Sequence, residues 1–281
     1  MREVAATADA AGLPRRFGFL PGYGMPGIDR RPWKRPAQAA APVYGCCCEC
    51  MDEAPGRAWD EAVAPYILQE PEWQFWRRLP RAAARRRWMR GRVAAKDAVR
   101  LLMLERLHLA ASLETIGILP DEHGQPQVTC AALPDLGAGI FVSISHCGNR
   151  SVALAAERSE FCRGVGIDVA SHADPHEGLA EGGFAPAETA LLEAYPAAER
   201  AGWLLWLWCA KEAVGKALGV GLMGDPLNYR VGRIHRTRRV VDIEARLGPE
   251  RAASAGATLR LAAHVGCERE MAYAVARLEG L

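Results

Sequence analysis

The hydrophobic positions of the chain follow a helical period in three places. The pattern predicts a long helix over residues 81–109, a short one over 186–194 and a second long one over 203–218. In the first long helix, the apolar residues that recur every three or four positions are Ala95, Ala98, Val99 and Leu102. An apolar stripe of this kind packs against a sheet or another helix.

Elsewhere, apolar and polar residues alternate with the period of two that a half-buried strand requires. Over residues 140–146, Ile140, Val142 and Ile144 fall on one face and alternate with Phe141, Ser143 and Ser145. Further strands are predicted over 151–156, 164–170, 240–247, 258–265 and 271–278. A helix and a hairpin occur in both halves of the chain. This predicts an α+β fold of two similar, pseudo-twofold lobes, each a helix packed on a small antiparallel sheet.

The division of the chain follows from where these patterns begin. Residues 1–55 are rich in Ala, Pro, Gly and Arg and show no sustained period, so we expect a flexible or loosely packed leader there. We expect an N-terminal lobe over residues 56–158 and a C-terminal lobe over 159–281, with regular structure beginning near Trp59.

The composition is that of an ordinary globular protein, with one local exception. Half of the 281 residues are hydrophobic, and the formal net charge is only +2. The segment from Arg77 to Arg100, however, holds nine arginines and Lys96 against one acid, Asp97. Such a segment meets an anionic partner or forms a solvated face. The stretch RRRWMRGR from Arg85 raises the alternative of a nucleic-acid binder. Because the basic surplus is confined to one helix, we expect no nucleic-acid partner.

The nine cysteines lack the spacing of a disulfide framework or a zinc site. Four of them fall in CCCEC at residues 46–50, where neighbours are too close to bridge one another, and no second C-x-x-C pair follows. We therefore expect reduced thiols and a cytoplasmic protein. The apolar run at residues 204–208 is too short to cross a bilayer, so we expect no membrane partner.

Two carboxylates stand out because apolar elements carry them. Asp168 lies within a short apolar strand, where an unpaired charge is costly unless a cation or several donors meet it. Glu212 and Lys216 share one face of the second long helix, and alone such a pair stabilises a helix by about 0.2 to 0.5 kcal/mol. Together with His146 at a strand end and the arginine-rich helix, these residues indicate a site for a hard cation and a phosphate ester.

The glycines after this helix match another phosphate-binding motif only in their letters. Gly219, Gly221 and Gly224 have the spacing of a dinucleotide-binding loop, but they follow a helix instead of leading from a strand into one. We interpret them as a glycine C-cap and a tight loop.

Five motifs in this order resemble those of the 4'-phosphopantetheinyl transferases of the surfactin-synthetase-activating (Sfp-like) type. They are GRVAAKDAVR at Gly91, HGQP at His123, SISHCG at Ser143, GVGID at Gly164, and W-x-x-K-E-A-x-x-K from Trp208, followed by GVGL at Gly219. The resemblance covers roughly residues 75–281. It implies an Mg²⁺-dependent enzyme that moves the phosphopantetheine arm of coenzyme A to a serine of an acyl or peptidyl carrier protein. The carriers would serve polyketide, nonribosomal peptide or fatty acid synthesis, and 3',5'-ADP would be released. Family members of this two-lobed length are usually monomers, so the resemblance implies a monomer.

By position in these motifs, the resemblance implies a role for each charged residue. Asp168 and Glu212 would ligate Mg²⁺ that bridges the coenzyme A pyrophosphate. Glu212 would also accept the proton of the carrier serine, and Lys216 would stabilise the departing ADP oxygen. The further residues implied to contact coenzyme A are Arg92, Lys96, Ser145, His146 and Lys211. A phosphate contact from the histidine would strengthen if its ring were protonated.

Two positions depart from the family's pattern. Many relatives place a glutamate two residues after the strand aspartate as a further metal ligand, but Ala170 stands here, so we expect weaker Mg²⁺ binding. The lysine common in the family's G-K-P turn is Gln125, which removes one phosphate contact. These changes leave an alternative open: a non-catalytic coenzyme A or carrier-protein binding module on the same fold.

Overall fold

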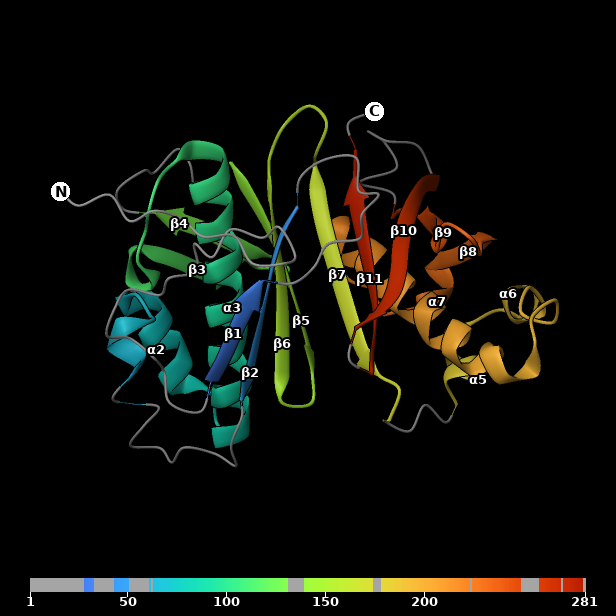
Figure 1. The fold of residues 1–281 in the computed structure, drawn as a ribbon, viewed down its shortest axis with the longest axis horizontal. Coiled ribbons are helices and arrows are strands. Elements are labelled where there is room, and N and C mark those ends of the chain that lie inside the picture. The colour runs from blue at the N-terminus through green and yellow to red at the C-terminus, as the bar shows by residue number, and fades with distance from the viewer. Residues whose placement is uncertain are drawn as a thin grey trace, which may run out of the picture.

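Two sheets lie face to face between two long helices in this computed structural model (Figure 1). Helix α3 (Ala82–Leu107) covers the outer face of one sheet, and α7 (Ala197–Ala217) covers the outer face of the other. The predicted α+β fold, with a helix on an antiparallel sheet in each lobe, is confirmed. The structure describes residues 28–32, 43–50, 61, 63–130, 139–173, 178–222, 224–248, 258–268 and 270–279.

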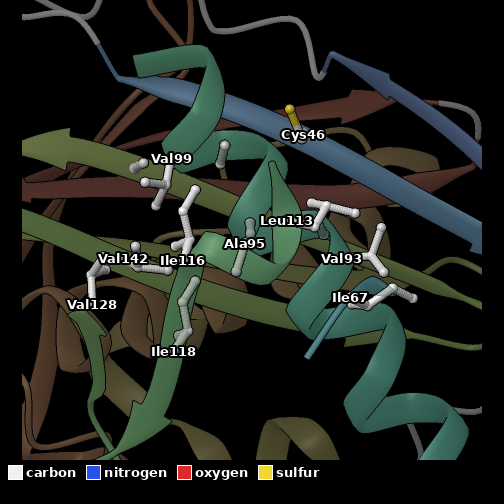
Figure 2. Close-up of a cluster of buried hydrophobic side chains, with 14 of the residues drawn as sticks. Cys46, Ile67, Val93, Ala95, Val99, Leu113, Ile116, Ile118, Val128 and Val142 are labelled. Carbon is white, nitrogen blue, oxygen red and sulfur yellow. The ribbon is translucent and has the colours of Figure 1, made fainter. Parts of the chain in front are cut away.

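The N-terminal sheet packs on α3 through the alternating apolar residues of its strands. Its order is β1-β2-β6-β5, formed by β1 (Ile28–Pro32), β2 (Tyr44–Cys50), β6 (Arg150–Glu157) and β5 (Ile140–Cys147). The other elements of this half are η1 (Ala64–Tyr66), α2 (Glu70–Arg78), η2 (Leu113–Thr115), β3 (Ile116–Pro120) and β4 (Pro126–Cys130). Val142 of β5 belongs to the same buried cluster as Val93, Ala95 and Val99 of α3 (Figure 2).

The C-terminal sheet has the order β7-β11-β10-β9-β8, and all of its pairs are antiparallel. Its strands are β7 (Gly164–Ser171), β8 (Tyr229–His235), β9 (Val240–Arg246), β10 (Thr258–Glu268) and β11 (Met271–Leu278). Helix α7 crosses β7 at close range, and it can do so because Gly164 and Gly166 have no side chains. A Cβ atom at these positions would overlap the carbonyl oxygens of Ala217 and Ala213, respectively. This close approach brings the α7 backbone down onto the strand that carries Asp168.

The expectation of a flexible or loosely packed leader over residues 1–55 is wrong for two segments, which form strands β1 and β2. Strand β2 pairs with β6, from Tyr44 opposite Ala155 to Glu49 opposite Arg150, and β1 extends the sheet beyond it. Regular structure thus begins before Trp59. The CCCEC run hid the strand, because a strand buried on both faces shows no polar alternation. The rest of the expected leader lies outside the described residues.

Several element boundaries also differ from the sequence prediction. Helix α7 begins at Ala197, directly after Pro196, and not at Trp203. The short helix α6 (Pro186–Ala190) ends earlier than expected, and α5 (Leu179–Gly183) was not predicted. Strand β8 and the short η3 (Pro226–Asn228) were not predicted. None of the helices within the described ranges combines the length and the apolar composition needed to cross a bilayer.

Each lobe contains a buried glutamate–lysine pair that ties the long helix to its surroundings. In the N-terminal lobe, Lys96 Nζ lies 2.6 Å from Glu72 Oε2. Glu72 accepts the N–H of Gln69 at the start of α2 and the N–H of Ile118 in β3, both at 2.8 Å. Lys96 also donates to the carbonyl of Ile67. Neither side chain is more than 1% exposed.

The C-terminal lobe repeats the main contacts of this arrangement. Lys211 Nζ lies 2.9 Å from Glu188 Oε1 and donates to the carbonyl of Gly183. Glu188 accepts the N–H of Ala185 before α6 and the N–H of Val231 in β8, both at 2.7 Å. The two lysines occur in the repeated sequences AKDAV and AKEAV on α3 and α7. The shared network supports the expected pseudo-twofold relation of the lobes.

The two sheets meet through apolar faces and serine hydroxyls. The apolar contacts come from Phe141, Val152 and Leu154 on one side and from Val165, Ile167 and Val275 on the other. Strands β5 and β7 are both edge strands. The Oγ atoms of Ser143 and Ser145 accept the N–H groups of Ile167 at 3.0 Å and Val169 at 3.3 Å. The hydroxyls therefore satisfy donors on the edge of β7 that its own sheet leaves open.

No disulfide bond joins the cysteines whose side chains the structure describes. Cys46 and Cys48 pack in the core beneath α3, whereas Cys47 faces the second sheet. Burial raises the pKa of the Cys46 thiol well above its ordinary value. These cysteines act as small apolar residues in the two cores.

Removing Lys211 should destabilise the protein strongly, because Glu188 would keep a buried charge without its partner. We expect Lys211→Met to lower the free energy of unfolding by about 3–5 kcal/mol, and Lys96→Met to have a similar effect. Urea denaturation followed by circular dichroism measures this. The matched control is Arg106→Met, which removes the half-exposed pair with Glu157 and should cost less than about 1 kcal/mol. Equal losses in control and lysine variants would contradict the role of the buried pairs.

Candidate functional site

A cavity of about 260 Å³ lies where the two lobes meet. The N-terminal lobe lines it with Arg92 of α3, Gln125 of the β3–β4 turn, and Ser143 and His146 of β5. The C-terminal lobe contributes Lys216 and Gly219 from the end of α7 and the residues after it. The motifs that are far apart in the sequence thus converge on one pocket.

Asp168 is a nearly buried carboxylate at the boundary of the lobes. Its Oδ1 accepts a hydrogen bond from Ser145 Oγ at 2.8 Å, across the boundary, and one from Lys216 Nζ at 2.7 Å. Its side chain is 11% exposed, and that of Lys216 is 26% exposed. The strand charge that the sequence left unexplained is therefore met by one cation and one hydroxyl from different lobes.

Glu212 lies close enough to Asp168 for the two carboxylates to repel. Burial raises the pKa of Glu212, the negative charge of Asp168 raises it further, and Lys216 lowers it. Cys209, one turn earlier on α7, hydrogen-bonds to Asp168, and burial together with that carboxylate raises the pKa of the thiol well above its ordinary value. No spacing signals this thiol contact, because Cys209 looks like any other apolar residue of the helix.

Arg92 presents a buried cation to the pocket. The residue is 6% exposed, and its guanidinium lies 4.2 Å from the centre of the Trp88 ring. Its Nε is buried without a hydrogen-bond partner among the described residues. Burial lowers the pKa of Arg92 to about 10, so it stays charged near neutral pH. A buried donor of this kind favours an anionic ligand, which would supply the missing acceptor.

His146 contacts the pocket as a neutral ring. Its Nδ1 lies 2.7 Å from Ser151 Oγ, and its other edge packs on Gly91 of α3, where a side chain would collide with it. Burial lowers the pKa of His146 to about 3, and the positive charges of Arg87, Lys216, Arg90 and Arg92 contribute in the same direction. The stronger contact expected from a protonated ring therefore does not apply to the ligand-free protein.

Three of the residues expected to contact coenzyme A are used elsewhere. Lys96 and Lys211 are 0% exposed and engaged with Glu72 and Glu188, so their ammonium groups do not reach the pocket surface. Burial also lowers the pKa of Lys96 to about 8. The Ser145 hydroxyl is engaged with Asp168 and the N–H of Val169. The sequence could not reveal these partners, because Lys96 and Lys211 lie 24 and 23 residues from their glutamates.

The β3–β4 turn closes one side of the pocket. Asp121 Oδ1 accepts the N–H groups of His123 and Gln125, both at 2.9 Å, which fixes the turn. The Gln125 amide then packs against Gly219, whose positive φ of 73° ends α7 as a C-cap. The interpretation of Gly219 as a cap is confirmed, and Gln125 stands where the family pattern has a lysine.

The carboxylates fit a hard divalent cation with few protein ligands. In the described part of the chain, no three His, Cys, Asp or Glu side chains form a metal-binding group. Asp168 and Glu212 do lie together, whereas Ala170, on the same face of β7, offers no ligand atom. Mg²⁺ typically keeps several waters and takes one or two carboxylates together with substrate phosphates. The residues therefore suit Mg²⁺ held jointly with a bound phosphate ester.

Residues 164–274 match the family model of the 4'-phosphopantetheinyl transferase superfamily. The match begins at β7, ends within β11, and contains Asp168, Glu212 and Lys216. A domain of this superfamily is therefore present, and the resemblance seen in the sequence is confirmed at that level. Among curated proteins, no match to the chain is found.

The neutral His146 should make the protein less stable in acid. Its folded pKa of about 3 lies below the ordinary value of 6.5 in the unfolded chain, so only the unfolded state binds this proton between those values. Its contribution should lower the free energy of unfolding as pH falls from about 6.5, by up to about 1.4 kcal/mol per pH unit. Urea denaturation at several pH values should show a shallower slope for His146→Gln. The exposed control His172→Gln should keep the wild-type slope, and equal slopes in all three proteins would contradict the assignment.

Proposed function

We propose that this protein transfers the 4'-phosphopantetheine arm of coenzyme A to a serine of an acyl or peptidyl carrier protein, with Mg²⁺ as cofactor. The superfamily domain supports phosphopantetheine transfer in general. One observation supports this pocket as the site of the reaction. Lys216 lines the pocket between the lobes and also holds Asp168, so the paired carboxylates lie directly behind the wall of a cationic pocket.

The pocket chemistry suits the phosphate groups of coenzyme A. Arg92 offers a buried donor that has no hydrogen-bond partner in the described part of the chain. Arg87, Arg90 and Lys216 add positive charge around His146. The neutral His146 can donate or accept one hydrogen bond, according to its tautomer. We propose Arg92 and His146 as the coenzyme A contacts, because Lys96, Lys211 and the Ser145 hydroxyl are engaged elsewhere.

Asp168 and Glu212 are the proposed metal ligands. When bound, Mg²⁺ would neutralise pyrophosphate charge and polarise the phosphorus that the acceptor attacks. Ser145 positions Asp168 from the opposite lobe through its 2.8 Å hydrogen bond. The absence of a carboxylate at Ala170 supports weaker metal binding than in relatives that have one.

The remaining chemistry falls to Glu212 and Lys216. The serine oxygen of the carrier attacks the β-phosphorus of coenzyme A, the new O–P bond forms, and the bond to the α-phosphate oxygen breaks to release 3',5'-ADP. Glu212 accepts the serine proton, directly or through a water molecule. Lys216 stabilises the negative oxygen of the leaving ADP.

The alternative function is a non-catalytic coenzyme A or carrier-protein binding module. Ala170 and Gln125 favour it, because each lacks a charge that relatives place near the phosphates. A nucleic-acid binder is less well supported. Trp88 of the arginine-rich helix stacks on Phe75 and lies beneath Arg92, so its ring already has partners. Five further properties are also proposals. They are the Sfp-like subtype, the pathway of the carrier protein, a location in the reducing cytoplasm, the monomeric state and the lobe boundary near residue 158.

The test is intact-protein mass spectrometry of apo acyl and peptidyl carrier proteins incubated with this protein, coenzyme A and Mg²⁺. We expect a gain of one phosphopantetheinyl group that EDTA suppresses. Glu212→Gln should reduce the rate by about 10²-fold or more, the contribution typical of a general base, while coenzyme A binding is largely kept. Glu193→Gln, an exposed acid ahead of α7, serves as the matched control. No gain on any carrier, with coenzyme A still bound, would favour the non-catalytic module.

A further inference from the structure

Lys216 forms an ion pair with Asp168, the carboxylate that is also a proposed metal ligand. Its Nζ lies 2.7 Å from Asp168 Oδ1 and 3.1 Å from the carbonyl oxygen of Ile167. The side chain is 26% exposed and lines the pocket, so its ammonium can exchange these acceptors for those of a ligand. Lysine suits such an exchange, because its charge sits on a long stem with several rotatable bonds.

A divalent cation and this ammonium compete for the same anion. Two cations placed on one carboxylate repel at short range, and the repulsion is strong where water is largely excluded. We infer that Lys216 is an internal counter-ion that holds Asp168 in the metal-free protein and leaves it for the pocket when the metal binds. The inference rests on the proposed function, because it concerns the metal and the phosphate ligand of that site.

The exchange couples the metal to the anionic ligand. Metal binding releases the donors of Lys216 into the pocket, where phosphate oxygens can accept them. An anion that draws Lys216 away in turn uncovers Asp168. By linkage, each of the two ligands must raise the affinity for the other by the same factor. The counter-ion thus keeps the carboxylates neutralised until metal and coenzyme A assemble together.

In the N-terminal lobe, the acid equivalent to Glu212 is held in buried ion pairs. Asp97 of AKDAV corresponds to Glu212 of AKEAV. Asp97 accepts hydrogen bonds from Arg30 at 2.6 and 2.8 Å and from Arg100 at 3.0 Å. The Arg30 and Asp97 side chains are only 6% and 3% exposed. That ion pair is sealed, whereas the Lys216–Asp168 pair opens onto a cavity, so only the second is placed to exchange.

Titration with Mn²⁺ alone, without coenzyme A, tests the inference by calorimetry and by the paramagnetic resonance of free Mn²⁺. Removing the counter-ion in Lys216→Met should tighten Mn²⁺ binding about tenfold, since the metal no longer displaces a cation. The control is Arg106→Met, which removes a half-exposed cation paired with Glu157 and should change the affinity less than about twofold. Asp168→Asn should abolish binding at this site.

The outcomes separate this inference from the proposed function. Lys216→Gln is the second variant, and circular dichroism confirms folding for each protein. Equal or weaker Mn²⁺ binding by both lysine variants, or unchanged binding by Asp168→Asn, overturns the inference. Adding coenzyme A should tighten Mn²⁺ binding by a larger factor in the wild type than in Lys216→Met. If the wild type transfers no arm but Lys216→Met binds Mn²⁺ more tightly, the counter-ion role stands and the proposed function fails.

Discussion

The site depends on a single buried anion, Asp168, which both lobes must satisfy. Ser145 reaches it from the N-terminal lobe, and Lys216 reaches it from α7. A carboxylate this deep is costly without such donors, so the arrangement of the lobes and the charge of the site stabilise each other. The close approach of α7 at Gly166 and the serine hydroxyls on the edge of β7 are the local features that make this geometry possible.

The two halves share a scaffold and differ in their chemistry. The pairs Lys96–Glu72 and Lys211–Glu188 anchor α3 and α7 in the same way, each linking a helix start and a strand to the long helix. In both lobes, the residue directly after the buried lysine is an acid, Asp97 on α3 and Glu212 on α7. In the first lobe arginines neutralise it in a sealed ion pair, and in the second Glu212 lies beside Asp168 behind an open pocket. Of these two acids, only Glu212 lies behind an open pocket in the described part of the chain, so it alone is placed to meet a ligand.

Local periodicity predicted much of the fold and part of the site. The long helices and the strands around Asp168 follow from apolar spacing, and the spacing of Glu212 and Lys216 placed them on one face. Long-range contacts escaped it. Strand β2 is stabilised by pairing with β6, about a hundred residues away in sequence. The glutamates that pair with the buried Lys96 and Lys211 lie more than twenty residues from them. The AKDAV and AKEAV repeat was the available signal that these lysines share one structural role. The neutral state of His146 depends on its burial, which no spacing reports.

In the loaded protein, we expect Asp168 and Glu212 to hold the metal and Lys216 to move to the phosphates. A crystal structure with Mn²⁺ and coenzyme A, with anomalous scattering to locate the metal, tests it most directly. We expect Mn²⁺ between the two carboxylates and the pyrophosphate, with Lys216 Nζ on a phosphate oxygen instead of Asp168. Manganese located elsewhere, or Lys216 still paired with Asp168 in the loaded protein, would contradict it.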